Sequence, residues 1–399
     1  MKIGLLTEEK IPEDERVVLT PQQCKWIIDN TDIDVVVKSS DVRCYSDSDY
    51  SNLGIDVVHD LSDCDVLLGV KEVPVDQLIS NKIYFYFSHT IKEQSYNRVL
   101  LQEMVKKNIT MIDYEAIKDS NNKRLIGFGR YAGIVGTYNA FLTYGLKSNK
   151  FFLKPANKCL GENEVYQELD KIKLSKEKII LTGGGRVAHG ALEILRKANI
   201  KEVSKEDFIK GVYNQAIFCR LEAMDYNERI DGIMSDKYDF YNYPEKYQSS
   251  FTNYTRDADI FIASHFYAPG SPYLFTTEDA KSNYFNLQVI ADISCDIDGP
   301  IASTIRSSSI ANPIYGYNPE NELEDDFKKD GVIAVMAVDN LPCELPQDAS
   351  DYFGNEFINK ILPCLIGDDP ERILERATIC KDGKLTSDFA YLKDYLIGN

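Results

Sequence analysis

Residues 178–200 read KIILTGGGRVAHGALEILRKANI, and they carry the clearest sign of the fold. An apolar run, a glycine turn and an amphipathic helical pattern follow one another, which is the context that dinucleotide binding requires. Gly183, Gly185 and Ala188 match the spacing G-x-G-x-x-A. Gly183 permits the tight turn, Gly185 lets the backbone approach a pyrophosphate, and the helix N-terminus attracts its charge. We therefore expect NAD or NADP to bind at Gly183, Gly185, Arg186, Val187 and Ala188.

The residue that binds the adenosine ribose would separate NAD from NADP. Glu206 and Asp207 lie about twenty residues beyond the glycine turn, where such an acid is expected, and Asp207 is the candidate. Lys201 and Lys205 flank the same place, so both cofactors stay open.

The rest of the chain shows the same alternation of strands and helices. Thr20, Pro21 and Gln23 form a helix-start pattern with a cap, a proline in the first turn and a glutamine three residues after the cap. Apolar runs separated by helical patterns predict a parallel sheet covered on both faces. In the first third of the chain these runs are residues 2–6, 34–39, 65–71, 83–88 and 110–115.

Two domains are expected from this pattern and from the length of 399 residues. The first comprises residues 1–137 and 349–399, and the second, at 138–348, binds the dinucleotide. Residues 211–250 are rich in tyrosine and polar residues, and we interpret them as an insertion between the second and third strands of the second domain.

Composition excludes several classes of function. The net charge is −18, with 63 acidic and 45 basic residues, which argues against nucleic acid and anionic membranes as partners. No apolar stretch is long enough to span a membrane, and the N-terminus does not look like a signal peptide. The nine cysteines form no Cys-x-x-Cys pair and are typical of reduced cytosolic thiols. We expect a cytoplasmic location, no metal site, small-molecule partners and a possible homo-oligomer.

A lysine and a histidine stand at the ends of two neighbouring strand patterns. Lys71 ends "LLGVK" and His89 follows "IYFYFS". Ligands bind outside the carboxyl ends of strands in open parallel sheets. Burial and neighbouring charge can bring both pKa values toward neutrality, so the two groups can divide proton transfers. Glu72 and Glu115 are the acidic neighbours expected to adjust them.

The chain resembles the L-lysine-forming saccharopine dehydrogenases and, more closely, the lysine–2-oxoglutarate reductase half of the bifunctional lysine-degrading enzyme. Both are relatives of alanine dehydrogenase. The "YPEKYQSSF" stretch of the tyrosine-rich region (243–251) looks like that reductase half. The other matching stretches run almost end to end: "ERVVLTP" (15–21), "VKEVP" (70–74), "SHTIK" (88–92), "DYE" (113–115), "GFGRYAGIVG" (127–136), "TGGGRVAHGA" (182–191), "ADISCDIDGPI" (291–301) and "VDNLPCELPQDAS" (338–350).

This resemblance implies an α/β fold with two Rossmann-like domains, parallel sheets and an active site in the cleft between the domains. It also implies an NAD(P)-dependent oxidoreductase that interconverts saccharopine with L-lysine and 2-oxoglutarate through an imine. Lys71 and His89 match the family's acid–base pair, and we assign Lys71 chiefly to the amine and His89 to the carbonyl or water step.

The remaining site residues follow from the same resemblance. Arg16 and Lys92 match cationic substrate contacts, and Glu72 and Glu115 match the acidic neighbours of the pair. Arg130 as a carboxylate clamp is our own inference. The expected contacts near the second domain's cofactor are Asp296, Asp339 and Leu341.

Two alternatives stay open. An alanine-dehydrogenase-like or other opine or amino-acid dehydrogenase would use a similar lysine and histidine, with ammonia and pyruvate in the alanine case. A non-catalytic NAD(P)H-binding protein is the second alternative, and it should have lost Lys71 or His89.

Overall fold

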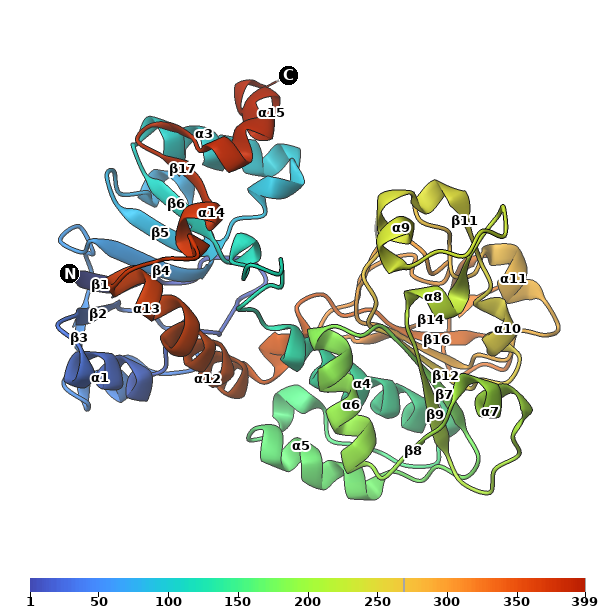
Figure 1. Ribbon diagram of the computed structural model, residues 1–399. Coiled ribbons are helices and arrows are strands. Elements are labelled where there is room, and N and C mark those ends of the chain that lie inside the picture. Colours follow the sequence, from blue (N-terminus) through green and yellow to red (C-terminus); the bar gives the residue numbers. More distant parts are fainter. Residues whose placement is uncertain (268–269, 399) are drawn as a thin grey trace. The chain divides into compact units, whose positions relative to one another are not determined.

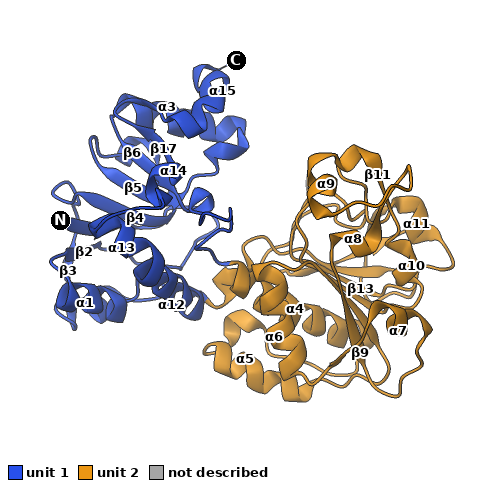
Figure 2. Cartoon of the chain, viewed as in Figure 1, with its two compact units in different colours: residues 1–128, 346–399 blue, residues 129–345 orange. Residues whose placement is uncertain are grey.

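The structure, a computed structural model, describes residues 1–267 and 270–398 (Figure 1). It divides into two compact units, shown in different colours in Figure 2. Unit 1 joins residues 1–128 with residues 346–399, and unit 2 is the continuous segment 129–345.

Both unit boundaries lie slightly earlier than the sequence pattern suggested. Each coincides with the first residue of a helix, α4 at Gly129 and α12 at Pro346. A boundary at residue 137 or 138 would divide α4 (Gly129–Ser148), which is one continuous helix within unit 2.

Unit 1 is built on an eight-stranded sheet in the order β18-β17-β6-β5-β4-β1-β2-β3. Strands β1 to β6 are parallel to one another. Strand β17 runs antiparallel to β6, and β18 runs antiparallel to β17. The central strand β4 has no exposed residue, as expected for a strand covered on both faces. The strands are β1 (Lys2–Leu5), β2 (Asp34–Lys38), β3 (Asp56–Val58), β4 (Val66–Lys71), β5 (Ile83–Phe87), β6 (Thr110–Asp113), β17 (Thr378–Lys381) and β18 (Lys384–Leu385).

The helices of unit 1 come from both parts of the chain. Helix α1 begins as its sequence indicates, because Thr20 caps it, Gln23 completes a capping box and Pro21 occupies the first turn. Buried glycine Gly354 of α12 lies against the Gln23 side chain. The helices are α1 (Pro21–Asn30), α2 (Asp47–Ser51), α3 (Arg98–Lys106), α12 (Pro346–Glu356), α13 (Leu362–Ile366), α14 (Ile373–Ala377) and α15 (Lys393–Ile397).

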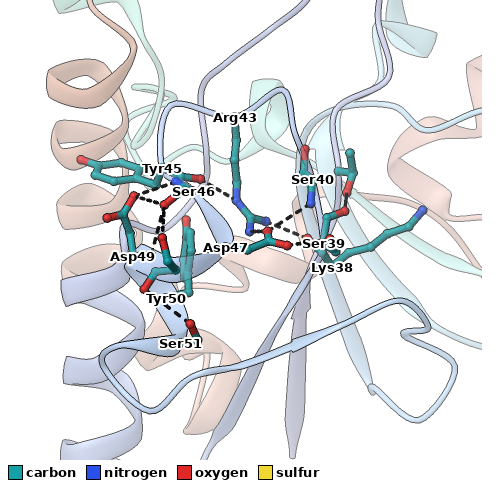
Figure 3. A network of polar contacts seen from close by, with 12 residues as sticks. Lys38, Ser39, Ser40, Arg43, Tyr45, Ser46, Asp47, Asp49, Tyr50 and Ser51 are labelled. Atoms are coloured by element: carbon teal, nitrogen blue, oxygen red, sulfur yellow. Dashed lines mark hydrogen bonds and ion pairs between the residues drawn. The ribbon is translucent and has the colours of Figure 1, made fainter.

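A polar network fixes the loop that leaves β2 (Figure 3). The Asp47 carboxylate accepts hydrogen bonds from the Ser39 hydroxyl, at 2.6 Å, and from the Ser40 backbone N–H, at 3.2 Å. Arg43 forms an ion pair with the same carboxylate. Ser46 then caps α2. The short connection from β2 to α2 is therefore held by its own side chains.

Unit 2 has a second eight-stranded sheet, in the order β15-β14-β16-β13-β12-β7-β9-β8. The strands from β8 to β16 in this order are parallel, and β14 and β15 are antiparallel additions at one edge. The strands of this sheet are β7 (Lys178–Thr182), β8 (Lys201–Glu202), β9 (Ile217–Leu221), β12 (Ile260–Ala263), β13 (Val289–Asp292), β14 (Ile314–Asn318), β15 (Leu323–Asp325) and β16 (Ile333–Met336).

The two longest helices of unit 2 pack against each other. Helix α4 crosses α6 at Gly133 and Gly190, where a Cβ atom on either residue would overlap backbone of the other helix. Helix α4 also packs on β12, β13 and β16. The helices are α4 (Gly129–Ser148), α5 (Glu162–Glu168), α6 (Arg186–Lys197), α7 (Lys205–Lys210), α8 (Ala223–Tyr226), α9 (Lys237–Asn242), α10 (Thr252–Thr255) and α11 (Thr277–Lys281).

The structure corrects the expected insertion at 211–250. Residues 217–221 form β9, which pairs along its whole length with β7 inside the main sheet. The run IFCRL is short and contains a cysteine and an arginine, so its apolar pattern is weak. Only the segment after β9 stands outside the sheet, and it contains the small hairpin of β10 (Asn227–Arg229) and β11 (Tyr247–Ser249).

The predicted fold class is confirmed: two α/β units each carry a mostly parallel sheet of Rossmann-like type. Across the described residues, no helix combines the length and the hydropathy needed to cross a bilayer.

Candidate active site and cofactor site

Three polar side chains gather at one edge of the unit 1 sheet. Lys71 is the last residue of β4, His89 follows β5 by two residues, and Glu115 follows β6 by two residues. Because β4, β5 and β6 are parallel neighbours, their carboxyl ends meet at the same edge. The charges of Lys71, Lys92 and Glu115 all act on the His89 imidazole. The structure therefore brings together the pair expected from sequence and two of its expected neighbours.

His89 has an unusual backbone and an unusual environment. Its φ of 54° lies in the left-handed region, which is uncommon for a residue other than glycine and often marks a functional position. Burial, with the positive charges of Lys71 and Lys92, lowers the pKa of His89 to about 4, while Glu115 opposes this change. The imidazole is therefore neutral at neutral pH and can accept a proton.

Two buried carboxylates that the sequence did not reveal hold the strand ends in place. Glu8 accepts hydrogen bonds from the backbone N–H groups of Val70 (2.6 Å) and Lys71 (2.8 Å). Burial raises the pKa of Glu8 to about 8, with a contribution from the charge of Asp14 and opposition from those N–H donors. Glu8 thus joins the loop after β1 to the carboxyl end of β4.

Asp113 plays the same part on the other side of His89. It accepts hydrogen bonds from the backbone N–H groups of Ser88 (2.9 Å) and Glu115 (2.7 Å), and the Ser88 hydroxyl also donates to it. Burial raises the pKa of Asp113 to about 6. In the sequence Asp113 is visible only as an acid at the end of an apolar run and as the first residue of the DYE stretch.

Glu72 and Glu115, the acidic neighbours of Lys71 and His89, each form ion pairs through one carboxylate oxygen. Glu72 forms an ion pair with Lys10. One oxygen of Glu115 lies 3.8 Å from the Lys92 amine and 3.1 Å from Arg124. The second carboxylate oxygen of Glu72 and that of Glu115 are buried and have no hydrogen-bond partner among the described residues.

Arg16 and Arg130 are both predicted to contact substrate carboxylates. They lie in different units of the chain. Arg16 is 3% exposed, makes two hydrogen bonds to Asp14 (2.8 and 2.6 Å) and stacks on Phe128 at 4.2 Å. Arg130 lies in α4 of unit 2, where it makes two hydrogen bonds to Glu193 (2.8 and 2.6 Å). These bonds link α4 to α6 within unit 2, and the role of Arg130 as a carboxylate clamp stays a prediction.

The glycine turn of unit 2 has the geometry expected of a phosphate-binding turn. Gly183 has a φ of +104°, and a Cβ there would lie 2.7 Å from the carbonyl oxygen of Ser264. Gly185 caps α6, and a Cβ there would meet no atom within 4 Å. Arg186 and Val187 begin the helix, and Ala188 is buried beneath it. The open space beside Gly185 fits the close backbone approach that a dinucleotide pyrophosphate requires.

A cavity of about 990 Å³ opens from this turn. It lies at the carboxyl ends of β7, β9 and β12, which are adjacent and parallel. Its lining residues are Gly183 to Val187, Glu222 to Tyr226, Ser235 to Tyr238, Tyr241, and Ser264 to Phe266.

Glu222, Asp225 and Asp236 are the acidic residues that line this cavity, and Asp207 is not among them. Glu222 follows β9, the strand beside β7, and its carboxylate would lie 3.4 Å from a Cβ on Gly184. Asp207 is exposed in the first turn of α7, where its backbone N–H and carboxylate bond to Ser204. The sequence pattern does not reveal Glu222, because it places β9 inside the expected insertion. The ribose acid is expected at the end of the strand next to the glycine-turn strand.

The other predicted cofactor contacts follow β13 and β16. Asp296 lies in the loop after β13, and exposed Asp339 lies shortly after β16. Leu341 is buried against α4, near the position of Gly136. These three residues therefore lie at the carboxyl edge of the same parallel sheet as the glycine turn, although none lines the cavity.

Comparisons with known proteins agree with these observations. The model of the alanine dehydrogenase/PNT N-terminal domain matches residues 4–135. The chain is 31% identical over 442 residues to alpha-aminoadipic semialdehyde synthase of Arabidopsis thaliana, covering 98% of this chain and 41% of that protein. It is 26% identical over 390 residues to saccharopine dehydrogenase [NAD(+), L-lysine-forming] of Emericella nidulans, covering 90% of this chain and 91% of that protein.

A solved L-alanine dehydrogenase shares the fold, with a TM-score of 0.63 at 16% identity over 100% of this chain and 99% of that one. The chain spans less than half the length of the alpha-aminoadipic semialdehyde synthases that it matches. The resemblance predicted from the motifs is thus confirmed: the chain is a homologue of the L-lysine-forming saccharopine dehydrogenases and of these synthases, and residues 4–135 match the alanine dehydrogenase/PNT N-terminal domain.

Proposed function

We propose that this chain is a nicotinamide-dependent amino-acid dehydrogenase that interconverts saccharopine with L-lysine and 2-oxoglutarate. The observation that carries the proposal is the lysine–histidine pair at neighbouring strand ends, with a neutral imidazole beside a positively charged amine. The similarity to saccharopine dehydrogenases along nine-tenths of the chain supports the choice of substrates.

The pair can divide the proton transfers of imine formation. The side-chain ammonium group of lysine must lose a proton before its amine attacks the keto carbon, and the hydroxyl group of the resulting carbinolamine must then leave as water. Neutral His89 is suited to accept the first proton, and the ammonium group of Lys71 is suited to protonate the departing hydroxyl group. This division is the reverse of the one expected from the resemblance.

The charged groups around Lys71 and His89 suit substrates that carry both positive and negative charges. The unpartnered oxygens of Glu72 and Glu115 can accept hydrogen bonds from a substrate amine, which would satisfy two buried acceptors. Arg16, fixed by Asp14, and Lys92 supply positive charge for the carboxylates of 2-oxoglutarate.

The cofactor would be held by unit 2 and supplies the hydride when bound. The turn at Gly183 to Val187 would hold the pyrophosphate, with backbone N–H groups at the start of α6 directed to it. Glu222 would accept hydrogen bonds from the adenosine ribose, which favours NAD over NADP because a carboxylate repels the additional phosphate. No metal is part of this proposal.

The test is oxidation of NADH and of NADPH, followed at 340 nm, each with lysine plus 2-oxoglutarate. We expect turnover that requires both substrates and yields saccharopine. His89→Gln and Lys71→Met should lower kcat/KM by roughly a hundredfold or more, while circular dichroism shows an intact fold.

The rival functions give different results in the same assay. Oxidation with ammonia and pyruvate but not with lysine would indicate an alanine-dehydrogenase-like enzyme. Binding of NADH without turnover of any keto acid would indicate a binding protein. Near-normal turnover by folded His89→Gln and folded Lys71→Met would contradict the proposed acid–base mechanism. A cytoplasmic location and homo-oligomer formation stay predictions.

A further inference from the structure

Residues 223–250, here called the appendage, fold as a small unit beside the main sheet of unit 2 (Figure 1). Strands β10 and β11 pair in an antiparallel hairpin. Arg229 pairs with Asp231 and Asp239, each at 2.6 Å, and the Tyr247 hydroxyl donates to Asp239 at 2.6 Å. Asp239 belongs to α9, so this network fixes α9 on the hairpin.

Helix α9 has one inner face and one outer face. Phe240 points inward, is 5% exposed and packs on Tyr247 with ring centroids 5.1 Å apart. Tyr238 and Tyr241 are three residues apart and so share a helix face. They are 66% and 44% exposed, and both line the cavity that opens from the glycine turn.

The wall of the cavity outside α9 has features that suit a nucleotide. It carries the glycine turn and Glu222. His265 completes it from the end of β12: the residue is 8% exposed and its Nδ1 lies 2.8 Å from the Thr182 hydroxyl. The Nε2 atom of His265 is buried and has no partner among the described residues, so this wall has an unused hydrogen-bonding atom.

We propose that the appendage forms the outer wall of the adenosine subsite, with the rings of Tyr238 and Tyr241 against the adenine. This proposal rests on the proposed function, because it takes the ligand to be an adenine dinucleotide. With a pyrophosphate at the glycine turn and a ribose at Glu222, Tyr238 and Tyr241 are aromatic residues of the remaining cavity lining that can meet the adenine.

The chemistry of α9 fits a flat aromatic base. Two tyrosine rings on one face offer a surface for stacking, and stacking of a base on an aromatic side chain is worth roughly 1–3 kcal/mol.

The experiment measures nucleotide affinity of the full chain by isothermal titration calorimetry. The variant Tyr238→Ala/Tyr241→Ala should raise the Kd of NADH and of ADP-ribose at least about tenfold. It should leave the Kd of reduced nicotinamide mononucleotide, which lacks the adenosine, unchanged. Tyr238→Phe/Tyr241→Phe keeps both rings and should bind like wild type.

The matched control is Tyr243→Ala. Tyr243 is a 47% exposed tyrosine of the same appendage, does not line the cavity and packs under Lys246. This variant should bind all three ligands like wild type.

Each outcome decides between the proposals. An unchanged Kd of NADH in the double alanine variant overturns the proposal that the appendage lines the adenosine subsite. An equal rise in the Kd of ADP-ribose and of the mononucleotide overturns it as well. A wild type that binds none of the nucleotides overturns this proposal and the proposed function together. Binding that follows the expected pattern, without turnover of lysine and 2-oxoglutarate, overturns the proposed function alone.

Discussion

Two glycines of the same turn should respond to substitution in opposite ways. At Gly183 an alanine would adopt a left-handed φ of +104° and place its Cβ 2.7 Å from the Ser264 carbonyl oxygen. The left-handed backbone costs roughly 1–2 kcal/mol, and crowding in a packed site adds roughly 1–3 kcal/mol. Gly183→Ala should therefore lower the free energy of unfolding by about 2–5 kcal/mol, a large part of the usual 5–15 kcal/mol.

At Gly185 the same reasoning predicts an intact fold and lost binding. Its φ of −88° and ψ of −165° are accessible to any residue, and no atom lies within 4 Å of a Cβ there. Gly185→Val should lower stability by about 1 kcal/mol or less, the usual cost of a poorer helix cap. The valine would occupy the space into which a pyrophosphate must come, so the Kd of NADH should rise at least about tenfold, or ~1.4 kcal/mol.

The assay pairs urea denaturation, followed by circular dichroism, with calorimetric titration of NADH and NADPH at a temperature where each variant is folded. Gly185→Ala provides a graded control, since a methyl group fills less of the space than an isopropyl group. Wild-type affinity in folded Gly185→Val would refute the assignment of the turn. Wild-type stability in Gly183→Ala would refute the reasoning from backbone geometry.

Three further predictions concern buried titratable groups. The NMR titration of His89 in the free protein should have a midpoint near pH 4, and Lys92→Met should raise it by removing a positive charge; a midpoint at the ordinary value of 6.5 would contradict the burial of His89. Burial lowers the pKa of His265 from 6.5 to about 4, so stability that is present above pH 6.5 is lost as the pH falls toward 4, by on the order of 3 kcal/mol. His265→Gln should flatten this dependence in urea melts, and an unchanged slope would show that His265 does not cause it. Burial raises the pKa of Asp113 from 3.8 to about 6, so its contribution is present below pH 3.8 and is lost as the pH rises through 6. Wild type should therefore lose on the order of 3 kcal/mol relative to Asp113→Asn between pH 4 and 7, and parallel pH curves for the two proteins would refute this.

Local patterns in the sequence predicted much of the architecture. The strand, glycine turn and helix at 178–197 are continuous in the chain, so their residues alone specify the turn. Lys71 and His89 were placed at neighbouring strand ends because β4 and β5 are consecutive runs of strong apolar character. Both inferences needed only short-range information.

Long-range pairing was the part that sequence reasoning could not supply. Strand β9 is five residues long with polar members, and only its pairing with β7 identifies it, so Glu222 was missed with it. Glu8 bonds to backbone more than sixty residues away, at Val70. The bond from Arg130 to Glu193, which lies on another helix, is likewise invisible in the sequence.

Unit 1 is built from two segments that are distant in the chain, and this affects how the protein folds during synthesis. Unit 2 is one uninterrupted segment, whereas the unit 1 sheet needs β17 beside β6, with the whole of unit 2 between them in the chain. Unit 2 can complete its core while the ribosome still holds residues 346–399, because domains fold as units as they emerge. Until then β6 is an unpaired edge with free backbone groups, which is a recognised starting point for aggregation. We therefore expect the nascent chain to depend most on chaperones in the interval between completion of unit 2 and emergence of β17.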